Sequence, residues 1–371
     1  MRILVDYRPA LRARTGVGEY MHTIVQAYTA ACDDEVAIFT SSWKDRPSPT
    51  VASELRARVV DRRVPVSLLN YLWHRLEWPP VEMLAGAFDV VHAAHPLLIP
   101  AARAAQVVTV HDLFFFTHPE RTRAEVRRDY PLLAGSHARR ADAVITSSVH
   151  TRGLLIEHFD VAPERIYICP PGAPVWRTLG RAPNAPQNGY VLFLGTLEPR
   201  KNVGVLLDAY AALIRRAAHL PPLLIAGGTT PEAAEWLDRL SREPLKSHVT
   251  YRGYVANEDR EQLYAGARAL VLPSLDEGFG LPALEAMSAG VPVLASNRGA
   301  LPEVIDTGGV ILDPLDVDAW ASAIERVTND AQWAAHLGRA GLERARTFTW
   351  ERSAAELHRA YADAVRRRGE R

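Results

Sequence analysis

Short runs of β-branched and apolar residues alternate with segments whose apolar residues have helical spacing, along almost the whole chain. No other feature of the sequence restricts the possible folds as strongly as this alternation. In the first half, strands are predicted at residues 3–5, 36–39, 90–92, 107–110, 143–146 and 166–168, and helices at 17–31, 123–140 and 149–159. Strands that alternate with helices favour a parallel sheet whose faces the helices cover. The sequence therefore predicts an α/β fold.

The alternation stops at residues 169–189, which contain five prolines, and then begins again. Strands are predicted at 191–194, 223–226, 249–251, 269–272, 293–295 and 310–312, and helices at 203–217, from about 231, and at 282–289, 316–327, 331–346 and 350–368. One hydrophobic core rarely serves more than ~250–300 residues, so a chain of 371 residues indicates two domains. We expect Rossmann-like domains at 1–175 and 189–349, joined by a Pro-rich linker at 176–188.

Two α/β domains of this kind also predict where a ligand binds. Open parallel sheets bind ligands beyond the carboxyl ends of their strands. If the two domains face each other, they would enclose a ligand in the cleft between them.

Composition excludes several classes of protein. Lys plus Arg and Asp plus Glu both number 43, so no bulk attraction to nucleic acid is expected. The two cysteines, Cys32 and Cys169, form no C-x-x-C motif or disulfide framework, which fits a reducing cytoplasm. No apolar run approaches the ~20 residues that span a bilayer. The first residues are typical of a strand rather than a signal peptide, so we expect a soluble, cytoplasmic protein.

The most specific motif is the stretch 277–287, which follows a predicted strand and opens a helix. Gly278 and Gly280 would let the backbone approach a ligand closely. The helix that begins near Leu281 offers unpaired N–H groups and a positive dipole end, which suit a diphosphate. One of the two carboxylates, Glu277 or Glu285, could then reach a sugar while the other accepts hydrogen bonds from a ribose diol. The alternative is a Gly-rich turn with two solvated glutamates, but that leaves Phe279 in the loop unexplained.

A second motif, residues 195–202, lies just after one strand and just before a helix. Arg200 and Lys201 would lie where the first strand of the second domain ends, and both side chains suit phosphate oxygens. Positive charge at this place would stabilise a leaving nucleoside diphosphate, a task that a metal ion performs in other enzymes. The alternative is a solvated basic turn. Lys201 is, however, one of only three lysines in an Arg-rich chain.

Two signals in the first domain are weaker. Gly16, Val17 and Gly18 form a loop that runs into a helix, but the complete G-x-G-x-x-G is absent, so a flexible turn explains them equally well. His111 and Asp112 directly follow a buried strand, where His111 would face the cleft and bond a sugar hydroxyl. Asp112 would then fix the tautomer of that imidazole. The alternative is a structural histidine, and the other histidines show no reliable metal-ligand spacing.

Residues 68–78 are aromatic and amphipathic. One hypothesis is peripheral contact with the inner face of the plasma membrane, or the holding of a lipid-linked acceptor. The favoured alternative is a helix that packs on the first domain's sheet.

Taken together, these segments resemble the family 4 retaining glycosyltransferases, which have the two-Rossmann GT-B fold. The Glu277…Glu285 segment resembles the family's E-x7-E element, and residues 289–293 and 297–303 are also similar to the family pattern. The resemblance covers nearly the whole chain, from the Gly16–Gly18 loop to Asp313-Pro314, and is more specific in the second half.

The resemblance implies a role for each motif. Arg200 and Lys201 would bind the donor diphosphate, Glu285 the ribose, and Glu277 the donor sugar, together with the backbone of Gly278, Phe279, Gly280 and Leu281. His111 would contact the sugar near the reacting carbon, with Asp112 beside it. The backbone of Gly16, Val17 and Gly18 would close over the diphosphate, and the segment with Tyr254 and Val255 would pass beside the base.

The resemblance also bears on the mechanism and on the last helix. The leaving phosphate would assist the incoming hydroxyl on one face of the sugar, so no protein nucleophile, metal or other cofactor is expected. The terminal helix, residues 350–371, would cross back onto the first domain. Many relatives carry a basic residue at the position of Glu19, so a side-chain phosphate contact from that loop is not expected here.

The resemblance to polysaccharide mannosyl- and rhamnosyltransferases favours a GDP-sugar such as GDP-mannose, with a UDP-sugar as the alternative. A glycan or a lipid-linked glycan would be the acceptor. Competing hypotheses are a nucleotide-sugar epimerase on the same fold, an NAD-dependent dehydrogenase and a non-catalytic subunit. The missing G-x-G-x-x-G and the lack of an acidic residue closing the strand near residue 40 count against the dehydrogenase. The retained Arg200, Lys201, Glu277 and Glu285 count against the non-catalytic subunit.

Overall fold

The computed structural model describes residues 1–11, 16–119, 124–176, 189–216 and 220–370, and it divides into two compact units. Unit 1 comprises Met1–Gly172 with Thr349–Arg371, and unit 2 comprises Ala173–Phe348. The predicted linker at 176–188 lies outside the described residues, apart from Trp176.

Unit 1 is built on a seven-stranded sheet in which every neighbouring pair is parallel. The order is β3-β2-β1-β4-β5-β6-β7. The strands are β1 (Arg2–Asp6), β2 (Glu35–Thr40), β3 (Arg58–Asp61), β4 (Val90–Ala93), β5 (Ala105–Thr109), β6 (Ala143–Thr146) and β7 (Ile166–Ile168). The sequence predicted six of these strands and missed the edge strand β3.

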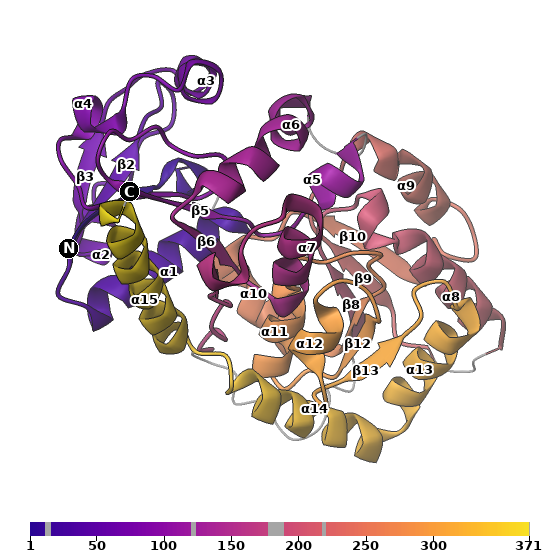
Figure 1. Cartoon of the computed structure of the whole chain (residues 1–371). Coiled ribbons are helices and arrows are strands. Elements are labelled where there is room, and N and C mark those ends of the chain that lie inside the picture. The colour runs from indigo at the N-terminus through magenta and orange to yellow at the C-terminus, as the bar shows by residue number, and fades with distance from the viewer. Residues whose placement is uncertain (12–15, 120–123, 177–188, 217–219, 371) are drawn as a thin grey trace. The chain divides into compact units, whose positions relative to one another are not determined.

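Helices cover both faces of this sheet (Figure 1). They are α1 (Val17–Ala31), α2 (Val51–Glu54), α3 (Val66–Tyr71) with the π-helical turn Leu72–Leu76, α4 (Val81–Ala85), α5 (Phe114–Thr117), α6 (Ala124–Arg140), α7 (Val149–Phe159) and α15 (Trp350–Gly369). Short 3₁₀ turns span Arg8–Ala10 and Pro163–Arg165. The C-terminal helix α15, yellow in Figure 1, lies beside α1 although more than 300 residues separate them in sequence.

Alternation along the strands explains the two cores of unit 1. Successive strand side chains point to opposite faces of a sheet. Ile3 and Val5 therefore pack against α1 and α15, while Leu4 packs on the other face with Phe39 and Trp73. Because both faces are covered, the sequence of a parallel strand is a continuous apolar run, and the strands were predicted from such runs.

Unit 2 repeats this plan with a six-stranded parallel sheet in the order β10-β9-β8-β11-β12-β13. Its strands are β8 (Tyr190–Leu194), β9 (Leu223–Ala226), β10 (Val249–Gly253), β11 (Ala267–Leu272), β12 (Val293–Ser296) and β13 (Val310–Leu312). Its helices are α8 (Val203–Arg216), α9 (Ala234–Leu240), α10 (Arg260–Ala265), α11 (Leu281–Ser288), α12 (Leu301–Ile305), α13 (Val317–Asn329) and α14 (Ala331–Ala345). Short 3₁₀ turns span Pro199–Lys201, Pro231–Ala233 and Asn257–Asp259.

The strand order reverses once in each sheet, beside β1 in unit 1 and beside β8 in unit 2. In open parallel sheets ligands bind at this reversal, beyond the carboxyl ends of the strands. In unit 2 the chain therefore delivers two loops to one place, the loop after β8 and the loop after β11. The predicted α/β class with two Rossmann-like domains is confirmed.

Candidate functional site

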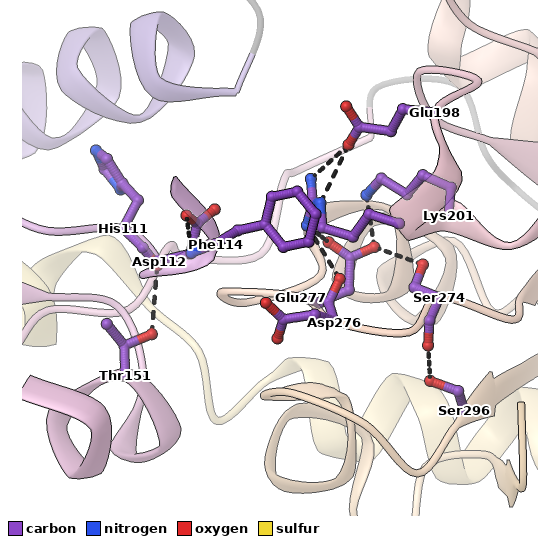
Figure 2. A network of polar contacts seen from close by, with 11 residues as sticks. His111, Asp112, Phe114, Thr151, Glu198, Lys201, Ser274, Asp276, Glu277 and Ser296 are labelled. Atoms are coloured by element: carbon purple, nitrogen blue, oxygen red, sulfur yellow. Dashed lines mark hydrogen bonds and ion pairs between the residues drawn. The ribbon is translucent and has the colours of Figure 1, made fainter. Parts of the chain in front are cut away.

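The two motifs of the second half meet at this reversal in unit 2. Lys201 Nζ lies 2.5 Å from Glu277 Oε1, and Arg200 Nη1 lies 3.2 Å from Glu277 Oε2. The hydroxyl of Ser274 donates to Glu277 Oε1 at 2.8 Å. Figure 2 shows the carboxylate of Glu277 between Lys201 and Ser274. We refer to Arg200, Lys201, Ser274 and Glu277 as the ion cluster.

Glu277 is ionised within this cluster despite its burial. Only 5% of Glu277 and 8% of Lys201 is exposed. Burial alone would raise the pKa of Glu277, but the charges of Lys201 and Arg200 and the bonds from Lys201 and Ser274 hold that pKa below its ordinary value. The carboxylate is therefore fixed as a charged acceptor, and the two cations are held within reach of whatever binds beside it.

The turn between β8 and α8 positions both cations. Pro199 begins a 3₁₀ turn, and Asn202 ends it in the left-handed conformation with φ 53°. The side-chain amide of Asn202 donates to the backbone carbonyls of Pro273 and Pro314 at 3.1 and 2.8 Å. The backbone N–H of Leu275 donates to the carbonyl of Arg200 at 2.7 Å. These bonds tie the loop after β8 to the loops after β11 and β13.

Arg200 is shared between two carboxylates. Its Nη2 lies 2.9 Å from Glu198 Oε1, and its Nη1 also donates to the carbonyl of Asp276 at 3.0 Å. With Glu198 included, the cluster holds two positive and two negative groups. A bound anion must therefore compete with these carboxylates or add to a preorganised set of donors.

Helix α11 begins beside the cluster, as the motif predicts. Gly280 is its N-terminal cap and has φ +98°, a conformation that favours glycine. A side chain at Gly280 would also place its Cβ 2.6 Å from Leu301 Cδ2. The backbone from Gly278 to Leu281 is therefore presented at the positive end of the helix dipole.

Gly299 supports the loop that carries Glu277. It has φ +61°, and an added Cβ would lie 2.4 Å from the backbone nitrogen and 2.5 Å from the backbone oxygen of Glu277. The N–H of Ala300 donates to that same oxygen at 2.8 Å. The sequence showed Gly299 only as part of the family-like stretch 297–303, so its contact with Glu277 was not predicted.

Two residues of the predicted donor site have side chains that pack in the core of unit 2. Phe279 is buried, and its ring meets Phe348 edge-on at 5.7 Å between centroids. Val255 is buried in the same apolar cluster, whereas Tyr254 is exposed. The sequence predicts a backbone contact for Phe279 and a place beside the base for the segment with Val255, and both stay predictions, because burial of these side chains leaves their backbone available. Leu281 packs partly against the same cluster.

Glu285 is engaged by two residues that the sequence did not suggest. Arg260 Nη1 lies 2.6 Å from Glu285 Oε1, and the hydroxyl of Tyr264 donates to Oε2 at 2.7 Å. Both partners come from α10, which is 20 to 25 residues away in sequence, and no local pattern marks them.

In unit 1, His111 follows β5 at the predicted carboxyl end of the strand. Its ring meets the ring of Tyr20 edge-on at 5.1 Å, and its carbonyl accepts from Thr151 Oγ1 at 3.3 Å. Nε2 of His111 is buried and has no hydrogen-bond partner among the described residues. A buried polar atom without a partner requires an explanation, and a bound ligand is one.

Asp112 does not play the predicted part. Its Oδ1 accepts a hydrogen bond from the backbone N–H of Phe114 at 3.1 Å. In Figure 2 the ring of His111 points away from this carboxylate. The expectation that Asp112 fixes the tautomer of His111 is not supported by this arrangement, because Asp112 caps the turn that follows.

The glycine loop of unit 1 leads into α1. Gly16 is the N-terminal cap of the helix with φ +50° and open space around it. Gly18 lies inside the first turn, and a Cβ there would be 2.7 Å from the carbonyl oxygen of Pro9. Packing of α1 on the Arg8–Ala10 turn thus requires a small residue at Gly18, and Val17 lies between the two glycines. Thr15 lies outside the described residues.

The amphipathic segment 68–78 is helical over most of its length. Leu69 and Trp73 pack in the core of unit 1 with Phe39, whereas Leu68, Tyr71, Leu76 and Trp78 are exposed. The segment is therefore both a packed helix and an apolar surface. No helix in the described ranges is long and apolar enough to cross a membrane. Within the same ranges no three His, Cys, Asp or Glu side chains are grouped to hold a metal ion.

Family models match both halves of the chain. The model of a family described as Glycosyltransferase Family 4 matches residues 14–177, and a model described as Glycosyl transferases group 1 matches residues 188–330. An O-antigen chain mannosyltransferase B from Escherichia coli is 31% identical over 383 residues, covering 97% of this chain and 99% of that protein.

Solved structures share the fold. A sucrose-phosphate synthase from Thermosynechococcus elongatus superposes with a TM-score of 0.76 at 22% identity, covering 98% of both chains. The Anabaena protein HepE, solved in complex with UDP and glucose, gives a TM-score of 0.71 at 19% identity, covering 98% of this chain and 99% of that one. At this level of identity the likeness concerns the fold.

Proposed function

The chain belongs to the family 4 glycosyltransferases, and from this membership we propose that it moves mannose, or a related hexose, from a GDP-sugar to a glycan with retention at the anomeric carbon. One observation carries the proposal. The ion cluster joins Arg200 and Lys201 to Glu277 at the strand reversal of unit 2, directly before the N-terminus of α11. Mannose as the sugar is supported by the full-length likeness to an O-antigen chain mannosyltransferase.

The cluster supplies what departure of a nucleoside diphosphate requires. Negative charge develops on the diphosphate as the bond to the sugar breaks, and fixed cations stabilise that charge without reorganisation. Arg200 and Lys201 would do this, together with the N–H groups at the start of α11. The leaving phosphate would take the proton of the incoming hydroxyl on the same face of the sugar, so the mechanism needs no protein nucleophile and no metal ion.

The carboxylates would orient the donor. Glu277 is held ionised and can accept hydrogen bonds from sugar hydroxyls, since a carboxylate offers about four acceptor positions. Glu285 would accept from the ribose diol. The exposed Tyr254 and the backbone of Val255 would lie beside the base.

Unit 1 would bind the acceptor glycan. We assign His111 to a hydroxyl of the donor sugar, because its buried Nε2 has no hydrogen-bond partner among the described residues. We further propose that the backbone of Gly16, Val17 and Gly18 contacts the donor diphosphate.

We also propose that unit 1 touches the membrane from the cytoplasmic side through its exposed apolar residues near Tyr71 and Trp78. The exposed Arg62 and Arg63 precede this segment and would favour anionic lipid headgroups. Co-sedimentation with vesicles that contain phosphatidylglycerol tests this contact. It should weaken when Trp78 is replaced by serine, and equal binding of both proteins would contradict it.

The function is tested by a transfer assay with GDP-mannose, UDP-glucose and a mannose-terminated oligosaccharide acceptor. We expect transfer from GDP-mannose, an α-linked product by NMR, and an unchanged rate in the presence of EDTA. A β-linked product would contradict retention, and loss of the rate with EDTA and its recovery with Mn²⁺ would contradict metal independence. Transfer from UDP-glucose alone would contradict the donor. Conversion of the donor without acceptor would instead support the epimerase.

His111 makes a separate prediction about pH. Burial lowers the pKa of His111 from 6.5 to about 4, so its ring is neutral through the physiological range. Because the folded pKa lies below the unfolded value, His111 reduces stability as the pH falls from 6.5 toward 4. We expect that His111 adds no inflection to the pH–rate profile between pH ~5 and ~8. An inflection near pH 6.5 that disappears in His111→Gln would contradict this.

A further inference from the structure

Two residues of α10 hold the carboxylate of Glu285 from one side. Arg260 and Tyr264 are four residues apart on the same helix, so their side chains project from one face. Each takes a different oxygen of Glu285, Arg260 at 2.6 Å and the Tyr264 hydroxyl at 2.7 Å. Together the two bonds fix both the position and the rotation of the carboxylate plane.

Because Glu285 is buried, its carboxylate needs the contacts with Arg260 and Tyr264. Glu285 lies inside α11 with only 8% of the residue exposed, and an unpaired carboxylate is costly in such a place. Arg260 supplies the counter-charge, and Tyr264 supplies a neutral donor. Burial, followed by the charge of Glu285, raises the pKa of Tyr264 well above its ordinary value, so the hydroxyl keeps its proton.

The support itself is anchored in unit 2. The ring of Tyr264 packs against Trp176 at 5.6 Å between centroids. Trp176 Nε1 donates to Ser288 Oγ at 2.8 Å, and the hydroxyl of Ser288 donates to the carbonyl of Glu285 at 2.8 Å. Backbone and side chain of Glu285 are therefore held by connected contacts, which leaves the carboxylate little freedom to adopt other rotamers.

A fixed carboxylate suits a cis-diol. A carboxylate has about four acceptor positions in all, so it can accept from several donors at once. We propose that Arg260 and Tyr264 are positioning residues that orient Glu285 to accept hydrogen bonds from both ribose hydroxyls of the donor nucleotide. This inference rests on the proposed function, and it makes the selection of ribonucleotides depend on two residues of α10 that act through Glu285.

Calorimetric titration with GDP and with 2′,3′-dideoxy-GDP tests the inference. Tyr264→Phe removes one hydroxyl and keeps the ring. We expect the Kd for GDP to rise about 10-fold, because a misoriented Glu285 loses the equivalent of one charge-assisted hydrogen bond to the ribose. The Kd for dideoxy-GDP should stay the same, because that ligand has no diol for Glu285 to bind. If the wild-type protein prefers UDP, the same comparison applies to UDP and its dideoxy form.

Two further proteins complete the experiment. Tyr210→Phe removes the hydroxyl of another buried tyrosine in unit 2, which bonds only to the carbonyl of Pro221 in the contacts described, and it should leave both affinities unchanged. Arg260→Gln should repeat the selective loss seen with Tyr264→Phe. Thermal melting of each variant checks that it is folded.

The outcomes separate this inference from the function on which it rests. Equal weakening of GDP and dideoxy-GDP in both variants, or no weakening of either, would overturn the positioning role. Equal affinity of the wild-type protein for GDP and dideoxy-GDP would overturn it as well, since Glu285 would then form no hydrogen bonds with the ribose diol. If the wild-type protein binds no nucleoside diphosphate, the proposed function itself fails.

Discussion

Replacing Lys201 by alanine is expected to lower kcat/KM for the sugar donor by about 10²-fold or more, the scale of one preorganised electrostatic contact. Lys201 lies 2.5 Å from Glu277 in a buried cluster, and no other lysine lies in the motif around it. Its loss removes one of the two cations assigned to the diphosphate. Arg200→Ala is expected to have an effect of the same size.

Lys246→Ala is the matched control, because Lys246 is an exposed lysine of unit 2 outside the cluster. It should keep the wild-type rate. Steady-state kinetics with varied donor measures the effect, and full transfer activity of Lys201→Ala would remove Lys201 from the diphosphate site.

Lys201→Ala should also change the pH dependence of stability. The pKa of Glu277 is held below its ordinary value, so the cluster stabilises the fold above the unfolded pKa and loses this contribution as the pH falls through the folded pKa. The difference in melting temperature between wild type and Lys201→Ala should therefore be present at neutral pH and shrink in acid.

Gly299→Ala is expected to be the second severe change. A Cβ at this position would lie 2.4 Å from the backbone nitrogen of Glu277, and φ +61° is unfavourable for alanine by roughly 1–2 kcal/mol. The loop that carries Glu277 must move to make room. A displacement of about 1 Å in a reacting site can cost about 10²-fold in rate, so we expect kcat/KM to fall by that order.

Gly228→Ala is the control for this substitution. Gly228 follows β9 in the same unit, and an added Cβ would meet nothing within 4 Å. Its activity and melting temperature should stay close to those of the wild type. Wild-type kinetics in Gly299→Ala would show that the position of the Glu277 loop is unimportant for transfer.

Much of the fold could be predicted because both sheets are parallel and covered on both faces. Such strands are continuous apolar runs, and stretches such as 143–146, 166–168 and 223–226 were delimited correctly from sequence alone. The edge strand β3 was missed, since Arg58 and Asp61 flank only two apolar residues there and, among the described strands, only β2 pairs with it.

The candidate site was predictable as a set of motifs but not as a set of contacts. Position after a strand, together with residue type, singled out Arg200, Lys201 and Glu277. Their pairing joins residues 76 and 77 apart in sequence, which only the sheet topology brings together. A plain Gly-rich turn left Phe279 unexplained, and the structure explains it by packing, because its ring meets the ring of Phe348.

Arg260 and Tyr264 show a different limit of sequence reasoning. They lie on a short helix without any motif, and their importance comes entirely from the carboxylate that they hold. Asp112 shows the opposite limit. Its place next to His111 suggested a hydrogen bond between the two side chains, but Asp112 accepts from the backbone N–H of Phe114.

Calorimetric titration of the protein with GDP, UDP, ADP and NAD, in buffer with EDTA, tests the central claim most directly. The ion cluster and the start of α11 predict tight binding of one nucleoside diphosphate, GDP, without metal and without binding of NAD. Binding of NAD alone would contradict the transferase and favour a dehydrogenase, and no binding of any of the four would indicate a non-catalytic protein.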